Sequence, residues 1–308
     1  MLIRLGYACI SKTIDVTTST NYSYTDFIKE NDYDKLDRII ISNLNALEEI
    51  IKYNLKNNIH FYRMSSKLIP LSTKEDVKFD YIKKYKEYYK SISKSIKDMR
   101  LDFHPDQFCV LNSTKKEVVE KSIEILKYHY NLLKCLNIKN KVLVIHVGGS
   151  TFGKDNSIRR FINNYNKLPL YLKECIVIEN DDKVFNINDC LKINKETNIP
   201  IVLDYHHHVC NHDDDLYKYI EDIFRTWKTK PKVHFSSPKN KTKKDFRSHN
   251  DYINSDDFIN FIENIKHLNF DIDIMIEAKA KDEALFKLVR ELKYKTNYSF
   301  IDETSFRV

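Results

Sequence analysis

Carboxylate and imidazole side chains stand at the ends of several apolar stretches in this sequence. The clearest case is 201–210, IVLDYHHHVC, where three apolar residues run directly into Asp204 and three histidines. The same arrangement recurs at His104, His146, Glu179, His234 and Glu277. Neutral histidine and ionised carboxylates together suit divalent transition metals such as zinc, manganese or iron. These residues predict a metal site if the fold brings them together.

Each residue also has an ordinary structural interpretation. A histidine at a strand end is commonly a hydrogen-bonded structural residue, and Glu179 or Glu277 could simply pair with a lysine. A carboxylate directly after CIVI or IMI would then be buried at considerable cost. We favour a shared site because the pattern recurs on most of the predicted strands. On an extended strand His207 would face away from His206 and His208, so the pattern alone does not decide among them.

The elements that must position these residues alternate along the chain. Apolar stretches typical of buried strands occupy 2–9, 59–65, 100–104, 141–147, 175–179, 199–207, 232–236 and 272–278. Helical periodicity lies between them at 34–57, 79–99, 117–136, 157–173, 189–198, 216–227, 258–268 and 283–292. This alternation predicts a single-domain (β/α)8 TIM barrel over 1–296, with a C-terminal tail over 297–308. A doubly wound open sheet is the alternative, but no GxGxxG follows the first strand.

Closure into a barrel would place the polar strand ends on one face. The metal-type groups there exceed what one ion needs, which suggests two or three ions sharing bridging carboxylates. Other residues lie at the ends of the predicted strands or in the loops that follow and would be near the site: Tyr7, Arg63, Ser65, Ser66, Gln107, Phe108 and His249. An aromatic ring there could stack on an exposed base, although a phenylalanine such as Phe108, taken alone, is more often a core residue. The basic stretch 239–247, KNKTKKDFR, would either neutralise phosphates or form a solvated loop.

Composition excludes several classes of protein. The chain has 308 residues, 42% of them hydrophobic and 31% charged, which is typical of a globular protein and not of a disordered one. No apolar run approaches a membrane span and the N-terminus lacks a signal-peptide core, so we expect a cytoplasmic location. The six cysteines include no CxxC pair, which argues against disulfides and a zinc ribbon, with Cys210 the one candidate ligand. The net charge of +7 permits a nucleic-acid partner without requiring one.

Taken together, the strand-end motifs resemble those of the UV damage endonuclease family. The resemblance runs from Ile3 to Asp282 and rests on IRLGYA, FYRMSSKLIPL, DFHPDQFCVLNS, VIHVGG, VIENDD, LDYHHH, KVHFSS, RSHNDYI and MIEAKAKD. It implies a TIM barrel related to endonuclease IV that nicks DNA 5′ to a UV photoproduct, leaving a 3′-hydroxyl and a 5′-phosphate. It also implies a cluster of two or three divalent ions, manganese first, with zinc, cobalt or magnesium as alternatives.

Residue roles follow from the same resemblance, motif by motif. The implied metal ligands are His104, His146, Glu179, Asp204, His207, His234, His249 and Glu277. The implied catalytic residues are Glu179, Lys232, His234 and Glu277, and Lys232 matches a lysine that can be carboxylated in the family. The predicted DNA-binding and lesion-binding residues are Tyr7, Arg63, Ser65, Gln107, Phe108 and Lys232, of which Gln107 and Phe108 match a pair that inserts into the duplex.

Two positions depart from the family pattern. Lys74 stands where relatives commonly carry a further ligand histidine, so one ion would be held more weakly or differently. Phe108 stands where some relatives have tyrosine, which keeps the stacking face and loses a hydroxyl.

The resulting hypothesis is metal-assisted hydrolysis of a phosphodiester in double-stranded DNA that contains UV lesions. We expect a monomer with no membrane and no obligate protein partner. An apurinic-site endonuclease of the endonuclease IV type is the second interpretation, and a metal-dependent sugar isomerase on a related barrel is the third. A DNA-binding barrel with a structural metal cluster is the non-enzyme alternative, which the number of ligands disfavours.

Overall fold

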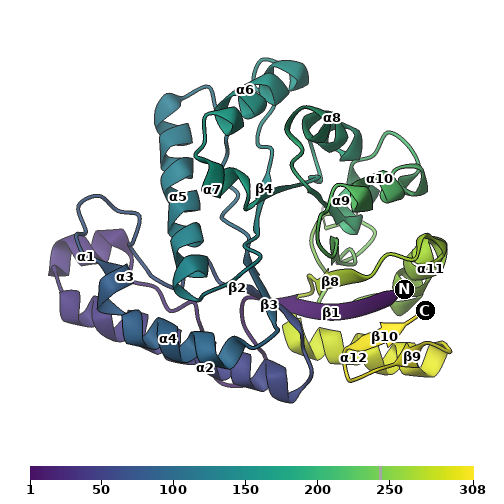
Figure 1. Ribbon diagram of the computed structural model, residues 1–308, viewed down its shortest axis with the longest axis horizontal. Coiled ribbons are helices and arrows are strands. Elements are labelled where there is room, and N and C mark those ends of the chain that lie inside the picture. The colour runs from purple at the N-terminus through teal and green to yellow at the C-terminus, as the bar shows by residue number, and fades with distance from the viewer. Residues whose placement is uncertain (243–244) are drawn as a thin grey trace.

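The structure is a computed structural model that describes residues 1–242 and 245–308, and its centre is a closed parallel barrel (Figure 1). The barrel strands are β1 (Leu2–Ala8), β2 (Phe61–Met64), β3 (Arg100–Phe103), β4 (Leu143–His146), β5 (Ile176–Glu179), β6 (Ile201–Asp204), β7 (Lys232–Phe235) and β8 (Ile272–Ile276). They pair in the order β2-β3-β4-β5-β6-β7-β8-β1, and a β1–β2 pairing closes the ring. The predicted TIM barrel is confirmed.

Helices surround the barrel on all sides (Figure 1). They are α1 (Tyr24–Glu30), α2 (Tyr33–Lys56), α3 (Tyr81–Lys84), α4 (Lys86–Ile96), α5 (Lys116–Cys135), α6 (Lys154–Asn166), α7 (Leu170–Lys173), α8 (Ile187–Thr197), α9 (Tyr205–Cys210), α10 (Ile220–Arg225), α11 (Ser255–Ile265) and α12 (Lys281–Lys295), with 3-10 turns η1 (Leu216–Lys218) and η2 (Lys266–Leu268). Pro169 separates α6 from α7, because a proline cannot continue the helix before it. No helix in the described part of the chain is long and apolar enough to cross a membrane.

Strand alternation divides the apolar residues into two environments. The large core lies between the barrel and the helices, while small separate clusters fill the barrel interior. One interior cluster contains Val144, Val177 and Val202. Because successive side chains on a strand point to opposite faces, the residues two positions further on, His146, Glu179 and Asp204, point inward again. The polar strand ends are therefore the last inward layer of the barrel.

The opposite end of the barrel interior is closed by a buried ionic group. Asp273 has no exposed surface, and its two oxygens accept hydrogen bonds from Arg4 Nε at 2.7 Å and Arg4 Nη2 at 2.8 Å. Arg100 Nη1 donates to the same carboxylate at 2.9 Å. Burial alone would raise the pKa of Asp273, but the hydrogen bond from Arg4 and the charge of Arg100 outweigh it and hold the pKa below its usual value.

The C-terminal residues, for which the sequence predicts no element, extend this sheet. β9 (Ser299–Phe300) pairs with β10 (Ser305–Arg307), and β10 pairs antiparallel with the first residues of β1. That edge is available because β2 pairs with β1 only from Gly6 onward. Phe306 has no exposed surface, so the hairpin is packed into the domain.

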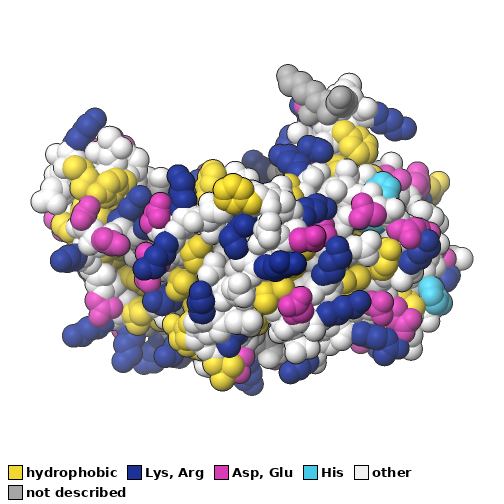
Figure 2. Space-filling view, turned by 90° about the horizontal axis from the view of Figure 1, so that it is seen from above, with side chains coloured by type: hydrophobic (Ala, Val, Ile, Leu, Met, Phe, Trp, Pro, Cys, Tyr) yellow, Lys and Arg dark blue, Asp and Glu magenta, His cyan; other side chains and the backbone are white. Residues whose placement is uncertain are grey.

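The carboxyl-end face of the barrel is concave. Figure 2, in which the barrel is seen from the side, shows a broad depression between two raised parts of the surface. One raised part lies on the side of α1 and the other on the side of α9. The strand ends that carry the polar residues open toward this depression.

We expect Asp273→Asn to destabilise the fold by about 3 kcal/mol at pH 7, because it leaves buried guanidinium groups without their carboxylate. Since the folded-state pKa of Asp273 lies below its unfolded value of about 3.9, this stabilisation is complete above that pH and is lost as the pH falls. Urea unfolding at pH 7 and at pH 3 measures both effects. The exposed Asp98 nearby provides the control, and Asp98→Asn should unfold like the parent chain.

Candidate metal centre

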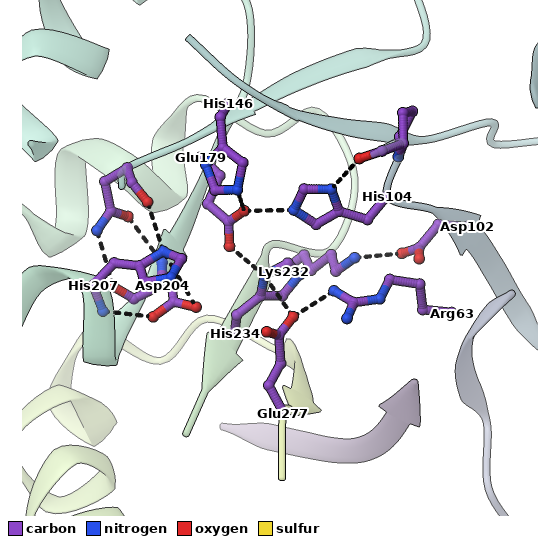
Figure 3. Close-up of polar contacts among 12 residues, drawn as sticks. Arg63, Asp102, His104, His146, Glu179, Asp204, His207, Lys232, His234 and Glu277 are labelled. Carbon is purple, nitrogen blue, oxygen red and sulfur yellow. Dashed lines mark hydrogen bonds and ion pairs between the residues drawn. The ribbon is translucent and has the colours of Figure 1, made fainter. Parts of the chain in front are cut away.

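Glu179, the last residue of β5, lies at the middle of the polar strand ends (Figure 3). Its Oε2 is 2.8 Å from His104 Nε2 and 3.5 Å from His146 Nε2. Its Oε1 contacts His234 Nδ1. The carboxylate is 1% exposed, so imidazoles from three strands or strand ends surround a carboxylate that water hardly reaches.

Asp204 and His207 form the second part of the centre. Asp204 ends β6 and caps α9, because its Oδ1 accepts a hydrogen bond from the His207 backbone N–H at 2.7 Å. The prediction of a strand up to His207 is therefore wrong beyond Asp204, since the aspartate begins a helix there. The helix brings His207 Nδ1 to 3.6 Å from Asp204 Oδ2 and directs His206 elsewhere, toward Phe246 and His249.

Asn180, which the sequence analysis did not single out, fixes this second part. Its amide donates to the Asp204 carbonyl and accepts from the Asp204 N–H, both at 2.9 Å. Its own carbonyl lies 2.9 Å from His207 Nδ1 and so orients the ring. Its position directly after Glu179 in VIENDD was the available signal.

Glu277 forms the third part, just beyond β8. Its Oε1 lies 3.2 Å from His234 Nδ1 and contacts Arg63 Nη1 (Figure 3). Its Oε2 is 3.9 Å from His249 Nδ1. Arg63 ends up inside the barrel mouth, 13% exposed at the side chain, where it neutralises a carboxylate.

The electrostatics favour neutral imidazoles at His146, His234 and His249. Burial lowers the pKa of His234 to about 4 and also lowers the pKa values of His146 and His249. At His207, burial is outweighed by the charges of Asp204, Glu179 and Glu277, which raise the pKa to about 9. Burial, assisted by the charges of Glu179 and Glu277 and opposed by His207, raises the pKa of Asp204 to about 8. Neutral histidine is the form that binds a metal, and added cations would stabilise the ionised carboxylates.

The donor atoms fit a cluster of divalent ions. Three groups have ligand atoms within 4.8 Å of one another: His104, His146 and Glu179; Glu179, Asp204 and His207; and Asp204, His234 and Glu277. Glu179 and Asp204 each belong to two groups, as bridging carboxylates would. Among the described residues, Asp204 Oδ2, His146 Nδ1 and His234 Nε2 are buried without a hydrogen-bond partner. His249 stands outside these groups, and Cys210, whose Sγ is 3.8 Å from His206 Nε2, is not in them either.

Of the predicted DNA-binding residues, some are exposed on the surface and others are buried. Gln107 and Phe108 are exposed on the β3–α5 segment, and Phe108 is 73% exposed. Ser65 is buried and shares a 2.7 Å hydrogen bond with Ser19. Tyr7 has no exposed surface, and its hydroxyl donates to Asn54 of α2 at 2.9 Å, on the helix side of β1. The structure thus brings Gln107 and Phe108 to the surface and keeps Tyr7 away from the donor cluster.

Lys232 occupies the barrel interior below His234. Its Nζ donates to Asp102 Oδ2 at 2.7 Å, and neither side chain has exposed surface. The two residues form a buried ion pair next to His234, one inward layer from the metal-type groups (Figure 3).

Two further predicted features have local partners. Lys74, at the position that departs from the family pattern, lies over the ring of Tyr24, 4.8 Å from its centroid. Within the basic stretch 239–247, residues 243–244 lie outside the described residues. Of the others, Lys239 pairs with Asp245 at 3.5 Å and Arg247 with Asp182 at 3.7 Å.

Fold and donor set together define a TIM-barrel enzyme with a candidate multinuclear metal centre. The sequence matches the family described as UV-endonuclease UvdE over residues 3–305, and the chain belongs to this family. It is 38% identical over 303 residues to the UV DNA damage endonuclease of Bacillus cereus strain B4264, covering 95% of each protein.

One solved structure supports this assignment, and a second shares the fold. The crystal structure of SacUVDE is 34% identical, with a TM-score of 0.87, over 95% of this chain and 98% of that one. Endonuclease IV from Thermus thermophilus matches over 95% of this chain and 100% of its own, with a TM-score of 0.56 at 11% identity. That second likeness concerns the fold alone.

Glu179→Gln should lower the number of divalent ions bound per chain, because it removes a negative charge shared by two donor groups. Metal content after dialysis against Mn²⁺ or Zn²⁺ and gel filtration measures this, with circular dichroism as the folding check. Glu174→Gln is the matched control, since Glu174 is an exposed carboxylate just before the same strand. Equal metal content in both variants would exclude Glu179 as a ligand.

Proposed function

We propose that this chain is a metal-dependent DNA repair endonuclease that incises the strand 5′ to UV photoproducts, leaving a 3′-hydroxyl and a 5′-phosphate. The observation that carries the proposal is a cluster of histidines and carboxylates, centred on Glu179, in a chain of the UvdE family. The relatives named as UV DNA damage endonucleases support the choice of lesion. The likeness to endonuclease IV concerns the fold alone, so it does not favour an abasic substrate.

The proposed cofactor is a cluster of two or three ions, with manganese the first choice. Residues His104, His146, Glu179, Asp204, His207, His234 and Glu277 would hold it, with His249 as an additional ligand. When bound, such ions supply a water of lowered pKa and positive charge beside a phosphate. The mixture of imidazole and carboxylate donors is compatible with manganese, zinc and cobalt.

The chain's own residues would prepare the site for this chemistry. Asn180 orients His207, and Arg63 holds the Glu277 carboxylate through an ion pair. The Lys232–Asp102 ion pair joins β7 to β3 one inward layer from His234. The depression at the carboxyl-end face (Figure 2) is compatible with a duplex lying across the strand ends.

Lesion selectivity would come from the β3–α5 segment. A crosslinked pyrimidine step is already poorly stacked, so displacing it costs less than the few kcal/mol needed for an intact pair. Phe108 exposes its ring next to Gln107, and the Phe108 N–H is held by Asp106 Oδ1 at 2.9 Å. Gln107 and Phe108 would fill the gap that the displaced bases leave. A single chain would act on double-stranded DNA in this way.

The first test is nicking of supercoiled plasmid, irradiated or untreated, with Mn²⁺ or with EDTA. We expect cutting that requires both irradiation and metal, and at least a hundredfold slower cutting by Glu179→Gln, because a metal ligand is lost. A plasmid containing abasic sites provides the third substrate. Equal cutting of irradiated and untreated DNA would contradict the lesion assignment. Preferential cutting of the abasic plasmid would instead favour an apurinic-site endonuclease.

Phe108→Ala should reduce the preference for irradiated over intact duplex by about tenfold, since one aromatic stacking contact with a base is worth roughly 1–3 kcal/mol. Ions bound per chain should not change, because Phe108 is not a donor. The ratio of kcat/KM values on a lesion duplex and an intact duplex measures the first effect. Leu170→Ala is the control, since Leu170 is 67% exposed on α7 at the other end of the barrel. Parallel loss of metal would contradict this role.

A further inference from the structure

Phe152 is a second exposed phenylalanine in a segment that follows the carboxyl end of a barrel strand. Its side chain is 77% exposed, and in the described part of the chain only Phe108 among the other phenylalanines is comparably exposed, at 73%. Phe152 lies in the segment between β4 and α6, six residues after His146. Phe108 follows His104 by four residues at the end of the neighbouring strand. Both rings therefore leave the same face of the barrel from adjacent segments.

The backbone of Phe152 is held in an unfavourable conformation. Its φ is +63°, in the left-handed region where a bulky side chain is rare and costs free energy. A residue persists there only when its surroundings fix it, and such positions are enriched at functional sites. Asparagine or glycine would fit the turn better, so the turn alone does not account for a phenylalanine here.

Hydrogen bonds hold this segment rigidly. The carbonyl of Thr151 accepts from Arg160 Nη2 at 2.6 Å, and the carbonyl of Phe152 accepts from Asn156 Nδ2 at 2.8 Å. The Gly153 N–H donates to the carbonyl of Ser150 at 2.9 Å and closes the turn. These hydrogen bonds fix the turn, while the aromatic ring is exposed to solvent.

Asn112 joins the Phe152 segment to the segment that carries Phe108. Its side-chain amide donates to the Gly149 carbonyl at 2.7 Å, and its own carbonyl accepts from Arg160 Nε at 2.9 Å. Gly148 packs so closely on Asn112 that a Cβ there would lie 2.2 Å from its Oδ1. The hydrogen bonds of Asn112 therefore link the two segments that carry Phe108 and Phe152.

We propose that Phe152 is a second DNA-contacting residue, whose ring stacks on a nucleobase of the damaged duplex near the lesion. This inference rests on the proposed function. A rigid aromatic ring loses little conformational freedom on binding, and every base offers a flat face for it. Its position on the face that holds the metal-type groups favours DNA over a protein partner as the ligand.

The direct test places a fluorescent ring at this position. Phe152→Trp is titrated in EDTA with a synthetic duplex containing one thymine dimer, so that binding is observed without cleavage. We expect quenching of the new tryptophan on stacking, measured as the difference from the parent chain. The native Trp227 is a suitable background, because its indole N–H donates to Ile201 O at the other end of β6. DNA binding without quenching would overturn the inference.

Substitutions supply the second measurement. Phe152→Ala should raise the KM for dimer-containing duplex about tenfold, as expected for loss of one stacking contact, while Phe152→Tyr should retain the parent value. Phe152→Gly should also weaken binding yet raise the Tm, because glycine relieves the left-handed strain. Tyr294→Ala is the matched control, since Tyr294 is 90% exposed on α12. Parent-like KM values for both Phe152→Ala and Phe152→Gly would contradict the role.

The two proposals fail separately. If the parent chain nicks irradiated plasmid but Phe152→Ala has an unchanged KM and Phe152→Trp is not quenched, only the role of Phe152 is wrong. If the parent chain does not nick irradiated plasmid while Phe152→Trp is still quenched by duplex, the lesion assignment is wrong and the DNA contact stands.

Discussion

The clustering of three carboxylates at one end of the barrel, two of them buried and the third largely so, is the constraint on which the site depends. Glu179, Asp204 and Glu277 come from three strands and lie close enough to share histidine neighbours. Buried carboxylates must be paired, hydrogen-bonded or bound to a cation. Arg63 pairs with Glu277, but Asp204 keeps a buried oxygen without a hydrogen bond. The carboxylates therefore require further positive charge, which a cluster of metal ions would supply.

In the rest of the barrel interior, lysine and arginine side chains alone neutralise the buried carboxylates. Lys232 pairs with Asp102 in the middle of the interior, and Asp273 is held by Arg4 and Arg100 at the far end. Small apolar clusters share the interior with these ion pairs, and Lys232 Nζ lies 5.2 Å from the centroid of the Phe61 ring. The interior therefore combines neutralised ion pairs with apolar packing, and only the layer at the carboxyl-end face has fewer cations than its carboxylates require.

Much of this arrangement could be predicted from strand patterning, and the errors have identifiable causes. Glu179 and His146 were predicted correctly as strand-end residues, because an apolar run that stops at a polar residue marks the end of a buried strand. The strand predicted to reach His207 ends earlier because Asp204 caps a helix, which the apolar run before it does not reveal. Tyr7 faces the helices because it is one residue out of phase with the inward positions of β1.

By itself the sequence determined the barrel, the family and the residue types of the site, since these depend on periodicity and on motifs that are local in the chain. It did not determine which atoms meet. Asn180 as the residue that orients His207, Asp102 as the partner of Lys232 and the Asn112 link between the two phenylalanine segments join residues far apart in sequence. Only tertiary structure decides such contacts, because strand register and barrel closure set the distances between these segments. The local sequence of one segment does not indicate which other segment it will contact.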